Sequence, residues 1–368
     1  MKFIIQCHQI IKPLQQVCSM LSNRPALPIL NNLLIKVSQD ILSITGTNIE
    51  MEMINNLVLT DLHEHEDGII TVPAKKFLEI CRGIPEKASI TVLLNDKTIL
   101  ICSDKSKFSL STLPANNFPK IEYLNSQLEF SVSHKNFKYL IEATYFSMAL
   151  QDTRYYLNGM LFETEGNILR TVTTDGYRLS ICTITIDKRV DNYSIIIPRK
   201  VIITILRLLD RTDNILQLKI NYKYIRIHVK SMILTSKLLS GSFPNYRKVL
   251  LQNYDKSLIV ECEMLKQALS RVAILSHERL HYVNFYIKLN QLKITAKNLA
   301  HEQAEETLVV SYIGDDLQIS FNVYYILDVL NVLKCEKIII WLNDTLSCIK
   351  IEAFTSQSAS YLIMSIRL

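Results

Sequence analysis

The chain has 368 residues, 48% of them apolar, which supports two or three domains at roughly 100 to 200 residues each. No run of about 18 uncharged apolar residues occurs and no signal-peptide pattern opens the chain, so we expect a cytoplasmic protein without a membrane partner. Only 8 glycines leave little room for a Gly-rich phosphate loop, and 8 cysteines without a C-x-x-C pair indicate reduced thiols rather than a metal site or disulfide framework.

A repeat with a period of about 125 residues organises the chain. Its anchoring leucines are Leu42, Leu169 and Leu292, which are 127 and 123 residues apart. In chain order, the apolar periodicities predict a helix, a hairpin, a second helix and a closing strand three times over. These are 8–21, 31–48, 73–83 and 108–111, then 134–149, 158–175, 198–211 and 234–238, then 263–276, 283–298, 322–334 and 361–364.

Start signals support the second helix of each copy. Pro73 and Pro198 stand at a first helical turn, and Asn322 is a favourable cap. Because each helix has a single apolar stripe, both helices of a copy must share one sheet face. The sequence therefore predicts an α+β fold of three repeated domains, each with two helices packed on antiparallel sheets, at 1–124, 128–252 and 256–368.

Positive charge is concentrated in the predicted helices. The net charge is only +6, yet the six helices hold thirteen Lys or Arg and five Asp or Glu. If all six line one surface, that surface binds a phosphate backbone in a salt-dependent way that ignores sequence. No recognition helix, zinc finger or aromatic RNA-binding motif is present to read bases. Solvated Lys-rich helix faces are the alternative, and the repeat favours the basic surface.

Motifs for catalysis are missing from the sequence. G-x-G-x-x-G, G-x-x-x-x-G-K-[ST], G-x-S-x-G and H-E-x-x-H do not occur. The segment His63–Asp67 is rich in metal-ligand types, but neighbouring strand positions point to opposite faces, so a solvated loop is the better interpretation. Asp175 and Arg178 form an acid–base pair in principle, but D-G-x-R is common in turns. We expect no catalytic residue, metal or cofactor.

Five motifs spread over all three copies resemble one family. They are Arg24–Asn32, Gln151–Gly159, Thr174–Leu179, Ser242–Tyr246 and Met364–Leu368. From Met1 to Leu368 the chain resembles the bacterial DNA polymerase III β subunit, the replication sliding clamp. The resemblance implies a non-catalytic processivity factor: a head-to-tail dimeric ring of six domains, whose helices line a central hole around duplex DNA. The ring then slides because its contacts ignore sequence.

The implied partners are double-stranded DNA, a second copy of the chain, the replicative polymerase catalytic subunit and clamp loader subunits. Translesion or repair polymerases and mismatch-repair factors are expected at the same peptide site. By resemblance, Arg24 and the loop from Gln151 to Tyr156 contact DNA, where Tyr155 and Tyr156 offer flat faces. Packing at a domain edge is the alternative for these tyrosines. From the basic helices we assign the channel cations Lys75, Arg82, Arg199, Lys200, Arg207 and Lys334.

The resemblance also implies a groove between domains 2 and 3 for a short linear peptide. Aliphatic side chains there accept a peptide's Leu and Phe, while polar atoms fix its backbone. The implied groove residues are Leu157, Thr174, Gly176, Tyr177, Arg178, Leu179, Pro244, Val249, Ile363, Met364 and Arg367. Several positions depart from the family pattern: Tyr177 replaces a common His, Ser365 and Ile366 a common Pro-Met, and Lys248 a frequent Arg.

A dimer seam between domain 1 of one chain and domain 3 of the other is the third implied site. Phe108 and Leu110 face Ile274 and Leu275 there, and Lys105 and Lys107 pair with Glu306. Gln303 replaces a usually acidic residue at this seam. An adaptor that binds peptides without encircling DNA is the competing hypothesis, which a weak seam would favour; an enzyme would need a bound metal or cofactor.

Overall fold

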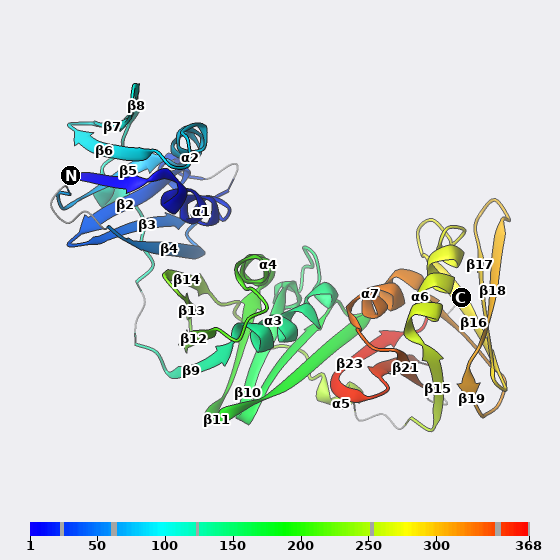
Figure 1. The fold of residues 1–368 in the computed structure, drawn as a ribbon. Coiled ribbons are helices and arrows are strands. Elements are labelled where there is room, and N and C mark those ends of the chain that lie inside the picture. The colour runs from blue at the N-terminus through cyan, green and yellow to red at the C-terminus, as the bar shows by residue number, and fades with distance from the viewer. Residues whose placement is uncertain (23–25, 60–64, 123–124, 251–253, 343–346, 367–368) are drawn as a thin grey trace. The chain divides into compact units, whose positions relative to one another are not determined.

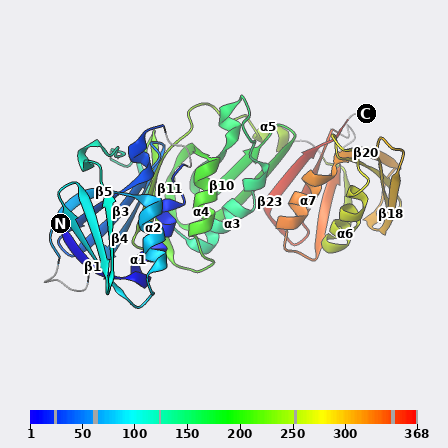
Figure 2. The ribbon, with the colours of Figure 1, turned by 90° about the horizontal axis from the view of Figure 1, so that it is seen from above.

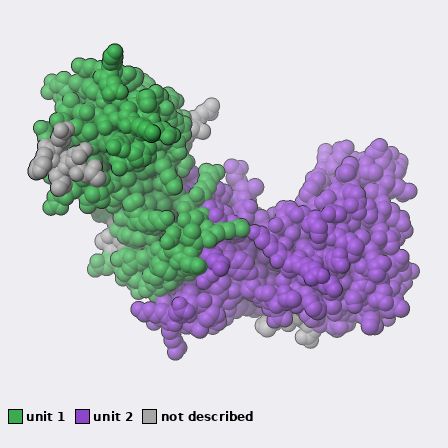
Figure 3. Space-filling view, viewed as in Figure 1, with its two compact units in different colours: residues 1–134, 207–238 green, residues 135–206, 239–368 purple. Residues whose placement is uncertain are grey.

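The computed structural model of the protein describes residues 1–22, 26–59, 65–122, 125–250, 254–342 and 347–366. The chain falls into two compact units, each treated by itself below (Figure 3). Unit 1 comprises 1–134 with 207–238, and unit 2 comprises 135–206 with 239–368. Each unit therefore takes one half of the second predicted repeat.

Unit 1 contains two antiparallel sheets and two full helices (Figure 1). One sheet has the order β1-β6-β7-β8, and the other, of eight strands, has the order β5-β2-β3-β4-β14-β13-β12-β9. Its elements are β1 (Lys2–Gln6), α1 (Cys7–Cys18), η1 (Pro28–Asn31), β2 (Asn32–Ser38), β3 (Ile41–Thr47), β4 (Met51–Val58), β5 (Gly68–Pro73), α2 (Ala74–Gly83), β6 (Ser89–Asn95), β7 (Thr98–Ser103), β8 (Ser106–Ser111), η2 (Ala115–Asn117), β9 (Leu128–Ser133), β12 (Ile215–Ile220), β13 (Tyr224–Val229) and β14 (Met232–Lys237).

Unit 2 is built in the same way. Its sheets have the orders β10-β11-β23-β22-β21-β15-β19 and β18-β17-β16-β20. Its elements, with α3 and α4 at the boundary to unit 1, are α3 (His134–Glu142), η3 (Tyr145–Ser147), η4 (Tyr155–Asn158), β10 (Gly159–Thr174), β11 (Arg178–Pro198), α4 (Arg199–Leu208), α5 (Arg247–Leu250), β15 (Lys256–Glu261), α6 (Cys262–Ala273), β16 (Tyr282–Lys288), β17 (Gln291–Lys297), β18 (Gln303–Val309), β19 (Ser311–Tyr312), β20 (Leu317–Asn322), α7 (Val323–Val332), β21 (Lys337–Leu342), β22 (Cys348–Ala353) and β23 (Ser356–Met364).

The predicted repeat is confirmed at the level of strand register. Equivalent residues form three rows of direct pairing partners, one row in each copy of the repeat. Each row crosses four neighbouring strands of a sheet. The rows are Phe3, Val92, Ile101 and Phe108; Phe130, Leu218, Ile227 and Leu234; and Leu258, Ile340, Ile351 and Tyr361. Eleven of the twelve are buried, which explains why the same register recurs: slipping by one residue would turn an apolar set towards water.

The helices cover the sheets in pairs. α1 packs against α2 in unit 1, and α6 packs against α7 in unit 2 (Figure 2). Each buries one stripe, such as Ile10, Leu14 and Val17 on α1. The Asn322 side chain accepts a hydrogen bond from the Tyr324 amide at 3.0 Å, so the predicted cap is present. No helix in the described part of the chain combines the length and apolar character needed to cross a bilayer.

Two predicted elements differ from the structure. α3 ends at Glu142 rather than near residue 149, because the Thr144 hydroxyl bonds back to the Leu140 carbonyl and a 3-10 turn follows. At 158–175, where a hairpin was predicted, β10 runs to Thr174 and pairs with β11 throughout. The pairing register shifts on both sides of Gly166, whose φ is +64°. The irregularity therefore lies where the turn was expected.

Gly159 provides a test of how tightly β10 is packed. A Cβ there would lie 2.7 Å from the Ile197 carbonyl oxygen, whereas a Cβ on Gly83 would meet nothing within 4 Å. We expect Gly159→Ala to lower the free energy of unfolding by about 1 to 3 kcal/mol, because backbone must move. Gly83→Ala should change it by less than about 1 kcal/mol. Urea unfolding of both variants checks this, and equal midpoints would contradict the close approach.

Candidate functional site

A tight turn joins β10 to β11 and carries the central predicted groove residues. Asp175 Oδ1 accepts from the amides of Tyr177 and Arg178, both at 3.0 Å, and the Thr174 hydroxyl donates to the Arg178 carbonyl at 2.6 Å. Gly176 has a φ of +93°, a conformation that a side chain disfavours. The Met364 amide donates to the Tyr177 carbonyl at 2.9 Å. The turn is therefore fixed to the end of β23.

Arg178 joins this turn to α7. Its Nε donates to Asp175 at 3.0 Å, one terminal nitrogen donates to Asp328 at 2.6 Å, and the other donates to the Phe146 carbonyl at 2.8 Å. The guanidinium also lies 4.5 Å from the centre of the Tyr325 ring. Each of its three nitrogens donates a hydrogen bond within the chain, so this arginine has a structural role.

The opposite face of the β11·β23 seam is apolar. Leu179 and Leu362 are direct partners and belong to one buried cluster with Tyr246. Around this cluster the exposed fractions are 64% for Tyr177, 40% for Val249 and 50% for Met364. We call these six residues the β11–β23 surface. Tyr177 and Met364 are joined by a backbone hydrogen bond, and Val249 precedes Leu250, which packs on the cluster. The exposed apolar side chains that border the cluster indicate a binding surface.

The remaining predicted groove positions fall into two sets. Pro244 and Gly176 are exposed, and each is close in the chain to a residue of the β11–β23 surface. Leu157 and Thr174 are buried. The prediction that Ile363 faces the groove is corrected. Ile363 is fully buried, and it is the direct strand partner of Arg178, so both side chains point to the α7 side of the sheet.

Leu362, which the prediction omitted, takes the place of Ile363 on the apolar face. Strict alternation along β23 from Met364 was the signal that identifies it. For the same reason Arg178 does not present its side chain to that face. Arg367 lies outside the described residues.

The loop predicted to contact DNA packs on this region. Tyr155 is 53% exposed and stands edge-to-face with Tyr156, which packs on the same apolar cluster. Arg154 donates to Asp152 through two nitrogens, at 3.0 and 2.9 Å, which lowers the pKa of that carboxyl to about 2. Gln151 is exposed with a φ of +54°. Tyr155 is therefore the loop's accessible ring.

Most of the predicted channel cations are exposed. These are Lys75, Arg82, Lys200, Arg207 and Lys334, the last lying just beyond α7. Arg199 is half-buried and donates to the carbonyls of Tyr145 and Met148 at 3.4 and 3.1 Å, so it has less to offer a phosphate. Arg24 lies outside the described residues.

The predicted seam residues lie on or beside two edge strands. β8 is an edge of its sheet and carries Phe108 and Leu110, with Lys105 and Lys107 exposed; β18 is an edge of its own sheet and carries Glu306. Ile274, which follows α6, is 78% exposed, while Leu275 is half-buried. Glu306 is bound by Arg271 of the same chain through two bonds of 2.6 and 3.1 Å, which lowers the pKa of Glu306.

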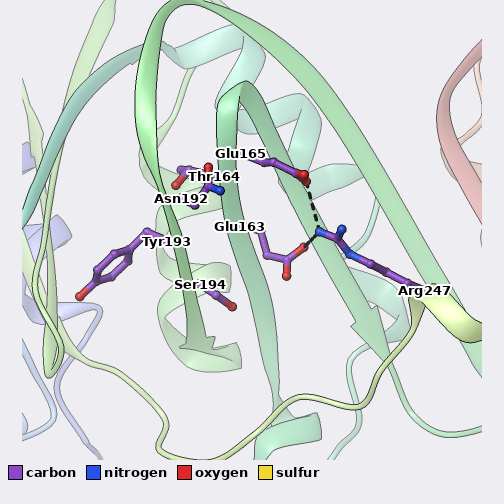
Figure 4. Close-up of a pocket in the computed structure, with 7 residues that line it drawn as sticks. All are labelled: Glu163, Thr164, Glu165, Asn192, Tyr193, Ser194 and Arg247. Carbon is purple, nitrogen blue, oxygen red and sulfur yellow. Dashed lines mark hydrogen bonds and ion pairs between the residues drawn. The ribbon is translucent and has the colours of Figure 1, made fainter.

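A charged cluster that the sequence did not reveal joins the start of α5 to β10. It consists of Glu163, Glu165, Arg170, Tyr246 and Arg247, and we call it the Glu163–Arg247 cluster. Figure 4 shows both carboxylates directed at Arg247, beside a cavity of about 340 Å³. Arg170 and Arg247 lower the pKa of Glu165, and burial raises the pKa of Tyr246. Its members are up to 84 positions apart in the chain, so no local pattern announces it.

The described residues show no constellation for covalent or metal chemistry. Among them, no group of three or more His, Cys, Asp and Glu is arranged to hold a metal ion. His63 lies outside these residues, and His65 Nε2 lies 4.0 Å from Asp40 Oδ1. All eight cysteines are free thiols, and burial raises the pKa of Cys81 and of Cys182 to about 12. Such thiols stay protonated and are poor nucleophiles.

Three copies of a two-helix domain joined by antiparallel strand pairing, with exposed cations on the helices and an apolar surface at the β11·β23 pair, are typical of DNA sliding clamps. Three successive matches agree with this class. Residues 1–122, 131–245 and 247–367 match the N-terminal, central and C-terminal domains of the DNA polymerase III beta subunit. The chain belongs to this family. It is a non-catalytic sliding clamp that acts with DNA polymerase III on DNA during replication.

Curated and solved relatives cover the whole chain. The beta sliding clamp of Escherichia coli K12 is 52% identical and that of Haemophilus influenzae 47%, each over 100% of both chains. The solved DNA polymerase III subunit beta of Pseudomonas aeruginosa is 39% identical, with a TM-score of 0.97 and full coverage of both chains. A sliding clamp from the same organism bound to griselimycin has a TM-score of 0.96.

Arg178 offers a test of the turn. We expect Arg178→Lys to lower the free energy of unfolding by about 1 to 3 kcal/mol, since an ammonium cannot reach Asp175, Asp328 and a carbonyl together. Arg154→Lys is the matched control: its pair with Asp152 is partly exposed and its bond to the Asp175 carbonyl is long, at 3.5 Å, so the change should cost less than about 1 kcal/mol. Urea unfolding measures both; a larger loss in the control would contradict the assignment.

Proposed function

We propose that two copies of this chain close head to tail into a ring around duplex DNA, and that the ring holds a polymerase through the β11–β23 surface. The carrying observation is that two internal seams already show how the domains join. β4 pairs with β14 within unit 1, and β11 pairs with β23 within unit 2. The repeat leaves β8 and β18 as the two strands in equivalent positions at sheet edges.

The internal seams predict the register of the seam between copies. In the second row of paired residues Leu234 continues to Met53, and in the third row Tyr361 continues to Ser180. Ala304 occupies the place of Met53 and Ser180, because Gly46↔Met53 corresponds to Ala296↔Ala304. Phe108 should therefore pair with Ala304 of the second copy, which sets Lys107 opposite Glu305.

Such a seam satisfies two needs at once. The free backbone groups of β8 and β18 gain partners, which removes two exposed edges. Ile274 gains cover from Phe108 and Leu110, and burying large aliphatic groups contributes about 1.5 to 3 kcal/mol each. Lys107 then faces Glu305 rather than the expected Glu306, which keeps Arg271. Glu305 pairs with the exposed Lys293 at 2.8 Å and can exchange partners. A contact between unlike surfaces that closes after two copies gives a ring.

DNA contact in the ring is electrostatic. Arg24, Lys75, Arg82, Lys200, Arg207 and Lys334 supply cations to phosphates, with Arg199 a weaker contributor, and Gln151, Tyr155 and Tyr156 form the loop that meets DNA. Many weak contacts that ignore sequence allow sliding, because every step along the duplex is equivalent. The closed ring prevents escape by topology, and affinity is not required for retention.

The β11–β23 surface is the proposed peptide site. The apolar face that contains Leu179 and Leu362 accepts apolar peptide side chains, and the exposed Tyr177, Val249 and Met364 border it. The proposed ligands are short segments of the polymerase catalytic subunit and of clamp loader subunits, and of translesion polymerases and mismatch-repair factors that share the site. The proposed location is the cytoplasm, where replication takes place.

A disulfide across the seam tests the predicted register. We expect a Lys107→Cys, Glu305→Cys double variant to form a covalent dimer on mild oxidation, because directly paired strand residues have Cα atoms about 4.5 to 5.5 Å apart. Non-reducing electrophoresis reads the product. Wild type and a Lys107→Cys, Glu302→Cys variant, with a register wrong by three residues, are the controls. A stronger crosslink in the shifted variant would refute this register.

Retention on circular DNA tests encirclement. After loading onto nicked circles, the protein should remain bound at moderate salt, and cutting the circle once should release it, because only a free end lets a ring slide off. Gel filtration of labelled protein with intact and cut DNA gives the two retained fractions. Equal loss from both forms would mean ordinary electrostatic binding and would favour the adaptor hypothesis.

A further inference from the structure

The segment from Ser242 to Leu250 carries Val249 and Pro244, two residues of the proposed peptide site or its border. Within the segment, α5 is a single helical turn of four residues, and the Val249 amide donates to the Tyr246 carbonyl at 3.1 Å. So short a helix is not stable by itself. Its position must therefore come from contacts with the strands beneath it.

One set of these contacts is apolar. Phe243, Tyr246 and Leu250 recur at spacings of three and four residues and pack on the cluster that contains Leu179 and Leu362. This face fixes the depth of the segment over the sheet. It leaves rotation and sliding weakly restrained, because apolar contacts have little directionality.

The second set is the Glu163–Arg247 cluster, and it is directional. The Tyr246 hydroxyl donates to Glu163, and Arg247 donates to Glu165 at 3.2 Å and lies 3.8 Å from Glu163. Arg170 lies 3.5 Å from Glu163 and 3.3 Å from Glu165, so it holds both carboxylates in place. Glu163 and Arg170 are each less than one-fifth exposed, whereas Arg247 is 55% exposed.

We propose that the Glu163–Arg247 cluster is a positioning device for peptide binding: the ion pair from Arg247 to Glu165 sets where Val249 stands over the β11–β23 surface. None of these five residues except Tyr246 belongs to that surface. The proposal rests on the peptide-binding role proposed for the surface. Without the pair, the segment samples other positions. Peptide affinity then falls in proportion to the fraction of time that the segment still spends in the binding-competent position.

The test uses the full-length protein and a terminally blocked peptide that carries Leu and Phe but no ionisable group. Calorimetric titration should give an affinity about three- to tenfold weaker for Arg247→Gln and for Glu165→Gln. The Arg247→Gln, Glu165→Gln double variant should be no weaker than the worse single variant, because both remove the same pair. Lys288→Gln, which breaks an exposed pair with Asp316 elsewhere in unit 2, is the control and should bind as wild type does.

Salt separates positioning from a general loss of structure. Since the peptide is uncharged, wild-type affinity should fall as NaCl screens the pair, and that of the double variant should not change. Melting temperatures should agree within a few degrees, because a partly exposed pair contributes little stability. Wild-type affinity for both single variants, or additive losses in the double variant, would overturn the proposal.

A Val249→Ala, Met364→Ala variant distinguishes the two levels of inference. If it weakens peptide binding while Arg247→Gln does not, the peptide site stands and the positioning role is wrong. If neither variant weakens binding, the peptide site itself is wrong, and the positioning proposal falls with it.

Discussion

Hydrogen bonding between strand edges is the interaction on which this protein depends. The outer strand of a sheet leaves an edge of unpaired amide and carbonyl groups, and each repeat contributes strands to two sheets. Within the chain, β4 with β14 and β11 with β23 satisfy four of these edges in one common register. The sheets therefore continue from one repeat into the next, because pairing two strand edges satisfies their backbone groups directly. The same requirement, applied to β8 and β18, leads to the proposed ring.

The proposed division between topology and affinity explains the modest charge. A net charge of +6 is small for a protein that acts on DNA, and a sequence-reading protein would need groove contacts in addition. A closed ring needs neither property, because leaving the duplex requires opening a seam. Weak phosphate contacts then hold the duplex near the wall without fixing the ring at one place along it. Stronger contacts would slow sliding and add nothing to retention.

The proposed peptide site depends on structure that lies outside it. Arg178 fixes the turn that bears Tyr177 from the helix side of the sheet, and in our proposal Arg247 fixes the segment that bears Val249 through the carboxylates of β10. Arg178 uses its fork of donors to hold several elements at once, which lysine cannot do. An apolar surface by itself binds many peptides. The positions of the residues at its border, Tyr177 and Val249, determine the shape of the site and hence which peptides fit. In both cases the groups that set this position are charged and the groups that touch the peptide are apolar.

The sequence alone determined the repeat, the places of the helices, the α+β class and the family, because apolar periodicity, start signals and long motifs are local properties. It also nominated candidate residues for each proposed site. Only the tertiary structure decided which strand edges meet, that Ile363 and Arg178 point to the helix side, and that Glu306 is held by Arg271. The Glu163–Arg247 cluster was equally invisible, since Tyr246 follows Glu163 by 83 residues. The physical reason is that a strand's side-chain period is two, so a register change of one residue reverses every face. Register is fixed by partners far along the chain, and the local sequence does not contain them.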